Sequence, residues 1–162
     1  MNTRLYAAIV AAFVLMGYST ASVADSDSVS WKRIIGIIQA GNTVFDIAGG
    51  GQPWSTLGGE ARVGLRTGHV EFEVRGLVLA GSNSIGTVPA TINQVKGTIA
   101  CGLTAANQAD TPLVPLSAQG DAEFDGNITV PASCTAANIV FLIRIPTLPT
   151  SRWIANGAVR SP

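Results

Sequence analysis

The single histidine and the carboxylates around it come closest to an acid–base site in this chain. Residues 59–76 read GEARVGLRTGHVEFEVRG and contain His69, the only histidine. A histidine beside carboxylates can exchange protons near neutral pH. Two carboxylates that face each other across a groove can instead cleave a glycosidic bond. This stretch therefore raises the question of whether its charged residues form an active site or only the wet face of a hairpin.

Alternation of apolar and charged residues gives the stretch a structural explanation. Both sides of Thr67-Gly68 alternate with period two, which is typical of two strands that share one buried face. In the register that sets Val63 opposite Phe72, both faces are satisfied, and His69 lies in the solvated turn without a catalytic role. The charge pairs expected on the polar face are Arg62 with Glu73 and Glu60 with Arg75. Neutralised carboxylates of this kind argue against a hydrolase.

The segment DAEFDGN, residues 121–127, is the metal candidate. Asp121, Glu123 and Asp125 alternate before a glycine, as in the first half of an EF-hand calcium loop. The twelfth position is Ala132, where that loop needs a glutamate, and alternate residues of a straight strand stand about 6.6–6.8 Å apart. We therefore predict a hairpin that turns at residues 125–127 and no tight calcium site. No cofactor is expected, with weak calcium binding as the alternative.

A glycine-rich stretch, GGGQPWSTLGG at residues 49–59, is the candidate ligand loop. Trp54 can stack on a sugar or a peptide, and Gln52 can supply hydrogen bonds beside it. No Gly-Lys-Ser/Thr follows, so the loop does not match a phosphate-binding pattern. The chain also lacks the G-x-S-x-G pattern of a nucleophile elbow. Binding is thus better supported here than catalysis.

The N-terminus predicts export. Arg4 is followed by an apolar run of about 14 residues, which is short for a membrane span of roughly 20, and Ser22-Val23-Ala24 fits a small-x-small cleavage site. Residues 1–24 are therefore predicted to be a signal peptide that leaves no membrane anchor. The mature residues 25–162 carry a net charge of −1, which offers no electrostatic case for nucleic acid.

The only two cysteines, Cys101 and Cys134, fit the same compartment. An even pair in an exported chain predicts a disulfide, and the closed loop would contribute about 3–4 kcal/mol by the chain-entropy account. A metal site is less compatible with two cysteines and one distant histidine. Asn127-Ile128-Thr129 fits an N-glycosylation sequon, and whether Asn127 carries a glycan is left open because the source of the chain is not evident.

Short β-branched runs between turn residues predict one all-β domain, an antiparallel β-sandwich or barrel-like sheet of about 8–10 strands after the signal helix. The predicted strands are Val29–Gln39, Thr43–Ile47, Glu60–Arg66, His69–Leu79, Gln94–Cys101, Leu113–Leu116, Gly120–Phe124, Ile128–Val130, Ile139–Ile145 and Trp153–Val159.

Two stretches resemble the CHRD modules of secreted proteins. GGEARVGLRTGHVEFEVRGLVLAG, residues 58–81, is similar to their G-x-A-x-V-x-L hairpin, and RWIANGAVR, residues 152–160, is similar to their closing strand. The resemblance implies an antiparallel β-sandwich with a binding function. The His-x-His stretch of that family is missing after Leu77, so no role of those histidines is carried over. The chain also resembles small uncharacterised secreted bacterial proteins.

These observations predict a secreted or periplasmic β-domain without catalytic activity, structural or interaction-mediating, whose partner is an unknown extracellular protein or ligand. One alternative is a glycan- or peptide-binding module that uses Trp54 and its loop. The other is a hydrolase built on paired carboxylates. Two acids close together in a cleft would favour the hydrolase over the first two.

Overall fold

A computed structural model of the protein describes residues 27–102, 104, 106–146 and 151–161. The predicted signal peptide, residues 1–24, lies outside these residues. No helix occurs in the described part, and hence none that is long and apolar enough to cross a membrane.

The described chain is all-β, as predicted, because its apolar residues recur at alternate positions between short turns. Its strands are β1 (Ser28–Gly36), β2 (Thr43–Val44), β3 (Ile47–Ala48), β4 (Trp54–Ser55), β5 (Gly58–Gly64), β6 (His69–Arg75), β7 (Val78–Leu79), β8 (Gln94–Cys101), β9 (Gln108–Asp110), β10 (Val114–Pro115), β11 (Ala122–Asn127), β12 (Ile139–Ile145) and β13 (Arg152–Arg160). The predicted bounds of β8 and β12 are confirmed, the predicted strand Ile128–Val130 does not form, and the other predicted strands differ in their bounds or are divided into shorter strands.

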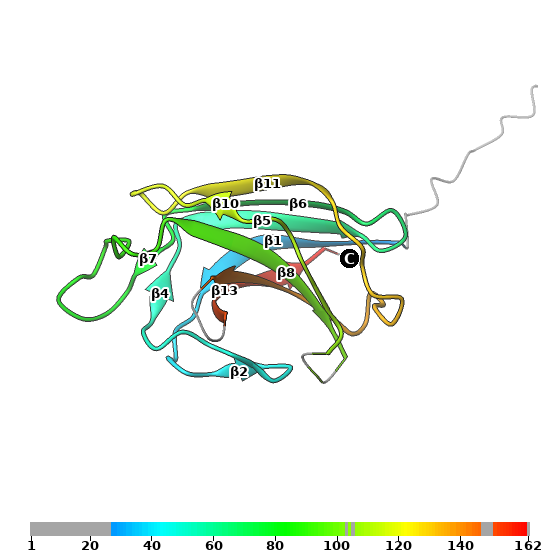
Figure 1. The fold of residues 1–162 in the computed structure, drawn as a ribbon, viewed down its shortest axis with the longest axis horizontal. Coiled ribbons are helices and arrows are strands. Elements are labelled where there is room, and N and C mark those ends of the chain that lie inside the picture. The colour runs from blue at the N-terminus through cyan, green and yellow to red at the C-terminus, as the bar shows by residue number, and fades with distance from the viewer. Residues whose placement is uncertain (1–26, 103, 105, 147–150, 162) are drawn as a thin grey trace, which may run out of the picture.

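Nine strands form one antiparallel sheet in the order β10-β8-β12-β13-β1-β5-β6-β11, with β9 paired to β8. The sheet curls into a half-barrel, with β11, β6, β5 and β1 on one side and β8 on the other (Figure 1). The end strands β10 and β11 come close together, although they are not hydrogen-bonded neighbours. The short pairs β2–β3 and β4–β7 stand apart from this sheet. The predicted sandwich or barrel-like class is therefore confirmed.

Aromatic rings from both sides of the curled sheet meet in the core. The ring centroid of Phe72 lies 5.4 Å from that of Phe141 and 6.0 Å from that of Phe124, and Trp31 lies 5.9 Å from Phe141. Gly97 lets the two central rings approach the backbone, because a Cβ there would come within 2.9 Å of Phe72 and 3.0 Å of Phe141. This packing holds β6 and β11 firmly, so their outward side chains have a rigid support.

The β5–β6 hairpin has the predicted faces but not the predicted register. Val63 lies opposite Val70 rather than Phe72, a shift of two residues that keeps the same side chains buried. The reason lies in the loop. Leu65 donates its N–H to Asp27 O (2.6 Å), outside the hairpin, and Gly68 closes the turn onto Gly64 O (2.8 Å). The predicted pairs of Arg62 with Glu73 and of Glu60 with Arg75 are therefore wrong.

The predicted turn at residues 125–127 is also wrong, because these residues belong to β11. That strand pairs along its whole length with β6, with Phe124 opposite Phe72, and not with residues 128–130. In this pairing Phe124 stacks on Phe72, with ring centroids 6.0 Å apart, and such aromatic pairs stabilise a sheet. The outcome is that the carboxylates of two strands distant in the sequence stand side by side.

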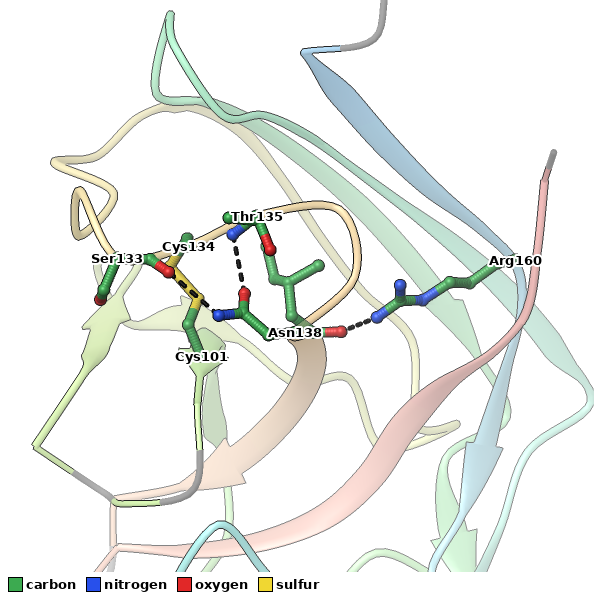
Figure 2. Close-up of a disulfide and its surroundings, with 7 residues drawn as sticks. Cys101, Ser133, Cys134, Thr135, Asn138 and Arg160 are labelled. Atoms are coloured by element: carbon green, nitrogen blue, oxygen red, sulfur yellow. Dashed lines mark hydrogen bonds between the residues drawn. A yellow bond between two sulfur atoms is a disulfide. The ribbon is translucent and has the colours of Figure 1, made fainter.

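Cys101 and Cys134 form the predicted disulfide, with Cα atoms 5.1 Å apart. Figure 2 shows how the loop after Cys134 is closed. The Asn138 side chain accepts from Thr135 N (2.7 Å) and donates to Ser133 O (3.0 Å). Arg160 donates to the carbonyl oxygen of the residue that follows Asn138, which joins this loop to the end of β13. The disulfide thus ties β8 to the segment that precedes β12.

Candidate functional site

The solvent-facing side of β1, β5, β6 and β11 carries rows of acidic residues. Across neighbouring strands, Glu60 lies directly opposite Glu73, and Glu73 lies directly opposite Glu123. Directly opposed residues have Cβ atoms about 4.5–5.5 Å apart, where like charges destabilise the sheet. All three glutamates are exposed. The strand order therefore produces a row of three carboxylates that the hairpin sequence alone did not indicate.

A second row is mixed in charge. Arg62 lies opposite Glu71, which in turn lies opposite Asp125, so one cation faces two acids. His69 begins β6 and is half-buried rather than in a solvated turn, with its Nε2 3.6 Å from Asp125 Oδ1. His69 is therefore not in the turn itself but is the first residue of the strand that follows it, as in the predicted strand His69–Leu79, and its side chain is 45% exposed. Its place beside Asp125 follows from the pairing of β11 with β6.

The two rows line a hollow of about 750 Å³ in the outer face of the sheet. We call it the acidic hollow and define it by its charged residues, which are Lys32, Glu60, Arg62, Glu71, Glu73, Glu123 and Asp125. Five acids and two cations give it an excess of negative charge. Field lines from such a surface extend about 8–10 Å into solvent at physiological salt, which attracts cationic groups.

A groove of about 960 Å³ with both charged and apolar lining adjoins the hollow, and we call it the apolar groove for its exposed aliphatic side chains. Lys32, Glu60 and Glu73 line both, so the two form one continuous strip. The groove also contains three of the six large hydrophobic side chains that are exposed in the described chain, which are Ile35 (39%), Ile38 (82%) and Leu57 (90%). Single exposed aliphatic residues are ordinary, but a group of them along one groove indicates a contact surface.

The candidate ligand loop lies at the border of this groove, but not as expected. Trp54 is only 4% exposed, and its backbone N–H donates to Ile37 O (2.8 Å). A ring buried in this way cannot stack on a sugar, so an exposed role for Trp54 does not fit the structure. Gln52 is exposed and accepts from Ser82 Oγ at 3.4 Å, and it is not among the residues that line the groove. Trp54 is therefore a buried residue in the wall of the groove.

The predicted metal candidates do not converge. Asp121 Oδ1 accepts the backbone N–H of Gly76 (2.9 Å), which holds the turn before β11. Glu123 and Asp125 instead face the glutamates of β6. Within the described ranges, no group of three or more His, Cys, Asp or Glu side chains is placed to hold a metal ion. Asp121 thus serves the local structure, whereas the other two belong to the acidic hollow.

A matched set of charges lies on β8, β9 and β12 and provides a contrast. Asp110 contacts Lys96 Nζ, accepts from Thr98 Oγ1 (2.6 Å), and lies 3.7 Å from Arg144 Nη1. Burial lowers the pKa of Arg144, and the Asp110 carboxylate opposes that shift. Arg144 also donates to Gln108 (2.8 Å). We call Lys96, Thr98, Asp110 and Arg144 the covered charge cluster.

Chemically, the acidic hollow can attract cations, and its opposed glutamates are close enough for acid–base work on a sugar. Glu60, Glu73 and Glu123 are all open to solvent and stand side by side on one sheet face, whereas the two acids of a glycosidase flank the bond that is cleaved. The polar residues and the neighbouring exposed aliphatics fit binding better. Comparison with known protein families, with curated proteins and with solved structures finds no match for this chain.

Proposed function

We propose that this protein is an exported, non-catalytic β-domain that binds a partner through the strip formed by the acidic hollow and the apolar groove. One observation carries the proposal, namely that Glu60, Glu73 and Glu123 stand in a row on an uncovered sheet face. Such a row costs stability, and a binding role accounts for its presence. The disulfide is compatible with a secreted or periplasmic location.

The proposal is tested by photo-crosslinking in the exporting cell. A photoreactive residue at Lys32, which borders both parts of the strip, should give a discrete adduct with one partner. The same residue at Asp46, which is exposed and lies outside the strip, serves as the control. Equal adducts from both positions, or none from Lys32, would contradict the proposal.

The second candidate is a hydrolase that uses two of the opposed carboxylates. Glu73 and Glu123 stand side by side on adjacent strands in a hollow, which is the observation that favours it. Incubation with a panel of polysaccharides and chromogenic glycosides tests this reading. Release of reducing ends by the native protein, lost in Glu73→Gln and in Glu123→Gln, would establish the hydrolase and overturn a non-catalytic role.

A further inference from the structure

The strip differs in chemistry from one end to the other, and this polarity describes its occupant. At one end, Ile35, Ile38 and Leu57 offer aliphatic surface to solvent. At the other end, the acidic hollow has five carboxylates and two cations. A partner that covers both ends must carry apolar groups and positive charges in separate parts.

We infer that the strip binds an extended peptide segment that is apolar in one part and rich in lysine or arginine in the next. The inference rests on the proposed function and names the chemistry of its partner. The apolar part lies in the groove, where burial of its aliphatic side chains against Ile35, Ile38 and Leu57 favours binding. The basic part lies over the hollow, where charge complementarity orients the segment and speeds its association.

The spacing of the carboxylates sets the pattern of the basic part. Glu71 and Glu73 are two residues apart on β6, as Asp125 and Glu123 are on the adjacent β11. Alternate residues of a strand stand about 6.6–6.8 Å apart, so an extended peptide with a cation at every second position matches both strands. A helix, which rises 1.5 Å per residue, would not keep that match.

The charged residues of the groove favour the same orientation of the peptide, with its basic part over the hollow. Its charged residues are Lys32, Arg33 and Arg75 together with Glu60 and Glu73, so cations are in slight excess. Arg75 Nε lies 3.4 Å from Glu73 Oε1, which shields that glutamate on its groove side. A lysine therefore gains more over the hollow than in the groove, and the two parts of the peptide do not exchange places.

A second copy of the chain fits the strip less well. Two hollows brought face to face would set five carboxylates against five others, with only two cations from each copy to offset them. Like charges that meet across an interface disfavour association. A basic partner removes this repulsion.

Fluorescence anisotropy with a labelled synthetic peptide tests the inference. The probe has leucine and valine in one half and lysine at alternate positions in the other, and a matched probe carries glutamate in place of lysine. The native protein should bind the lysine probe alone. Raising the salt from about 0.1 M to about 1 M shortens the Debye length from about 10 Å to about 3 Å and should weaken binding at least several-fold.

Double variants test separately the binding of the peptide's basic half to the hollow and of its apolar half to the groove. The E73Q/E123Q protein and the I38S/L57S protein should each bind the lysine probe about tenfold more weakly, the size of an ordinary contact residue at an interface. The I85S/D46N protein carries matched changes at exposed positions outside the strip and should bind as the native protein does. Urea unfolding of all three verifies that each is folded.

Absence of binding by the lysine probe, binding of both probes alike, or an equal loss in the I85S/D46N protein would overturn the inference. The proposed function has a separate outcome. If the crosslink from Lys32 forms but no basic peptide binds, the strip is a binding surface for a partner of other chemistry. If the crosslink fails as well, the proposed function itself is contradicted.

Discussion

The covered charge cluster and the acidic hollow use the same kinds of residue in opposite ways. In the cluster, Asp110 lies between two cations and a hydroxyl donor, and Arg144 is only 7% exposed. In the hollow, glutamate stands opposite glutamate on an exposed face, with Arg75 Nε 3.4 Å from Glu73 Oε1. Charges that serve the fold are matched with partners because burial makes an unmatched charge costly. Unmatched charges on an open face are tolerated by the fold, and they remain available to another molecule.

The largest expected effect comes from breaking the cluster. Asp110→Ala leaves Lys96 and Arg144 without their shared carboxylate, and the loss of one partner of a buried ion pair costs up to 3–5 kcal/mol. Because the Asp110 side chain is 30% exposed, we expect Asp110→Ala to lower the free energy of unfolding, measured in urea, by about 2–4 kcal/mol. Asp110→Asn keeps an acceptor for Thr98 and should lose less. A change below about 0.5 kcal/mol in the alanine variant would show that these charges are not structural.

A smaller effect of opposite sign is expected in the hollow. Glu123→Gln removes a negative charge that stands opposite Glu73, so the protein should become more stable by about 0.2–1 kcal/mol at low salt. The gain should fade as salt rises, because exposed charges are screened. Asp27→Asn is the matched control, since it removes the partner of Arg66 at 2.6 Å and should not stabilise. A loss of stability in Glu123→Gln would contradict the contrast between the two regions.

The smallest effect is expected at His69, which touches the hollow only at its edge. Its side chain is 45% exposed and its Nε2 lies 3.6 Å from Asp125 Oδ1, too far for a hydrogen bond. His69→Ala should therefore change the free energy of unfolding by less than about 0.5 kcal/mol. Chemical denaturation of the variant beside the native protein measures this. A cost near that of Asp110→Ala would place His69 among the structural charges.

The fold class and the face of each strand were within reach of the sequence, whereas the neighbours of each strand were not. Alternation predicted that Val63 and Phe72 are buried, and both are. A shift of two residues buries the same side chains, so alternation alone cannot distinguish the two registers. The loop hydrogen bond from Leu65 to Asp27 decides between them, and it joins the hairpin to a segment outside it.

Prediction of the candidate site was limited in the same way, because the sequence did not show which strands are neighbours. Glu123 and Asp125 were predicted as exposed carboxylates, but as part of a local hairpin and a weak calcium site. Their actual neighbours, Glu73 and Glu71, come from β6, about 50 residues earlier in the chain. The sequence did not predict the groove, because the exposed residue expected in the glycine-rich stretch was Trp54, whereas Trp54 is buried and Leu57 is exposed. Long-range pairing, which short motifs do not encode, created the strip.

The central claim is that the strip, and not the covered charge cluster, meets the partner. The most direct measurement is an NMR titration of the isotope-labelled mature protein with the lysine probe. We expect amide shift changes along β5, β6 and β11 and at Ile38 and Leu57, with the signals of Lys96, Asp110 and Arg144 unmoved. Shift changes centred on the covered charge cluster, or spread evenly over the protein, would contradict the account.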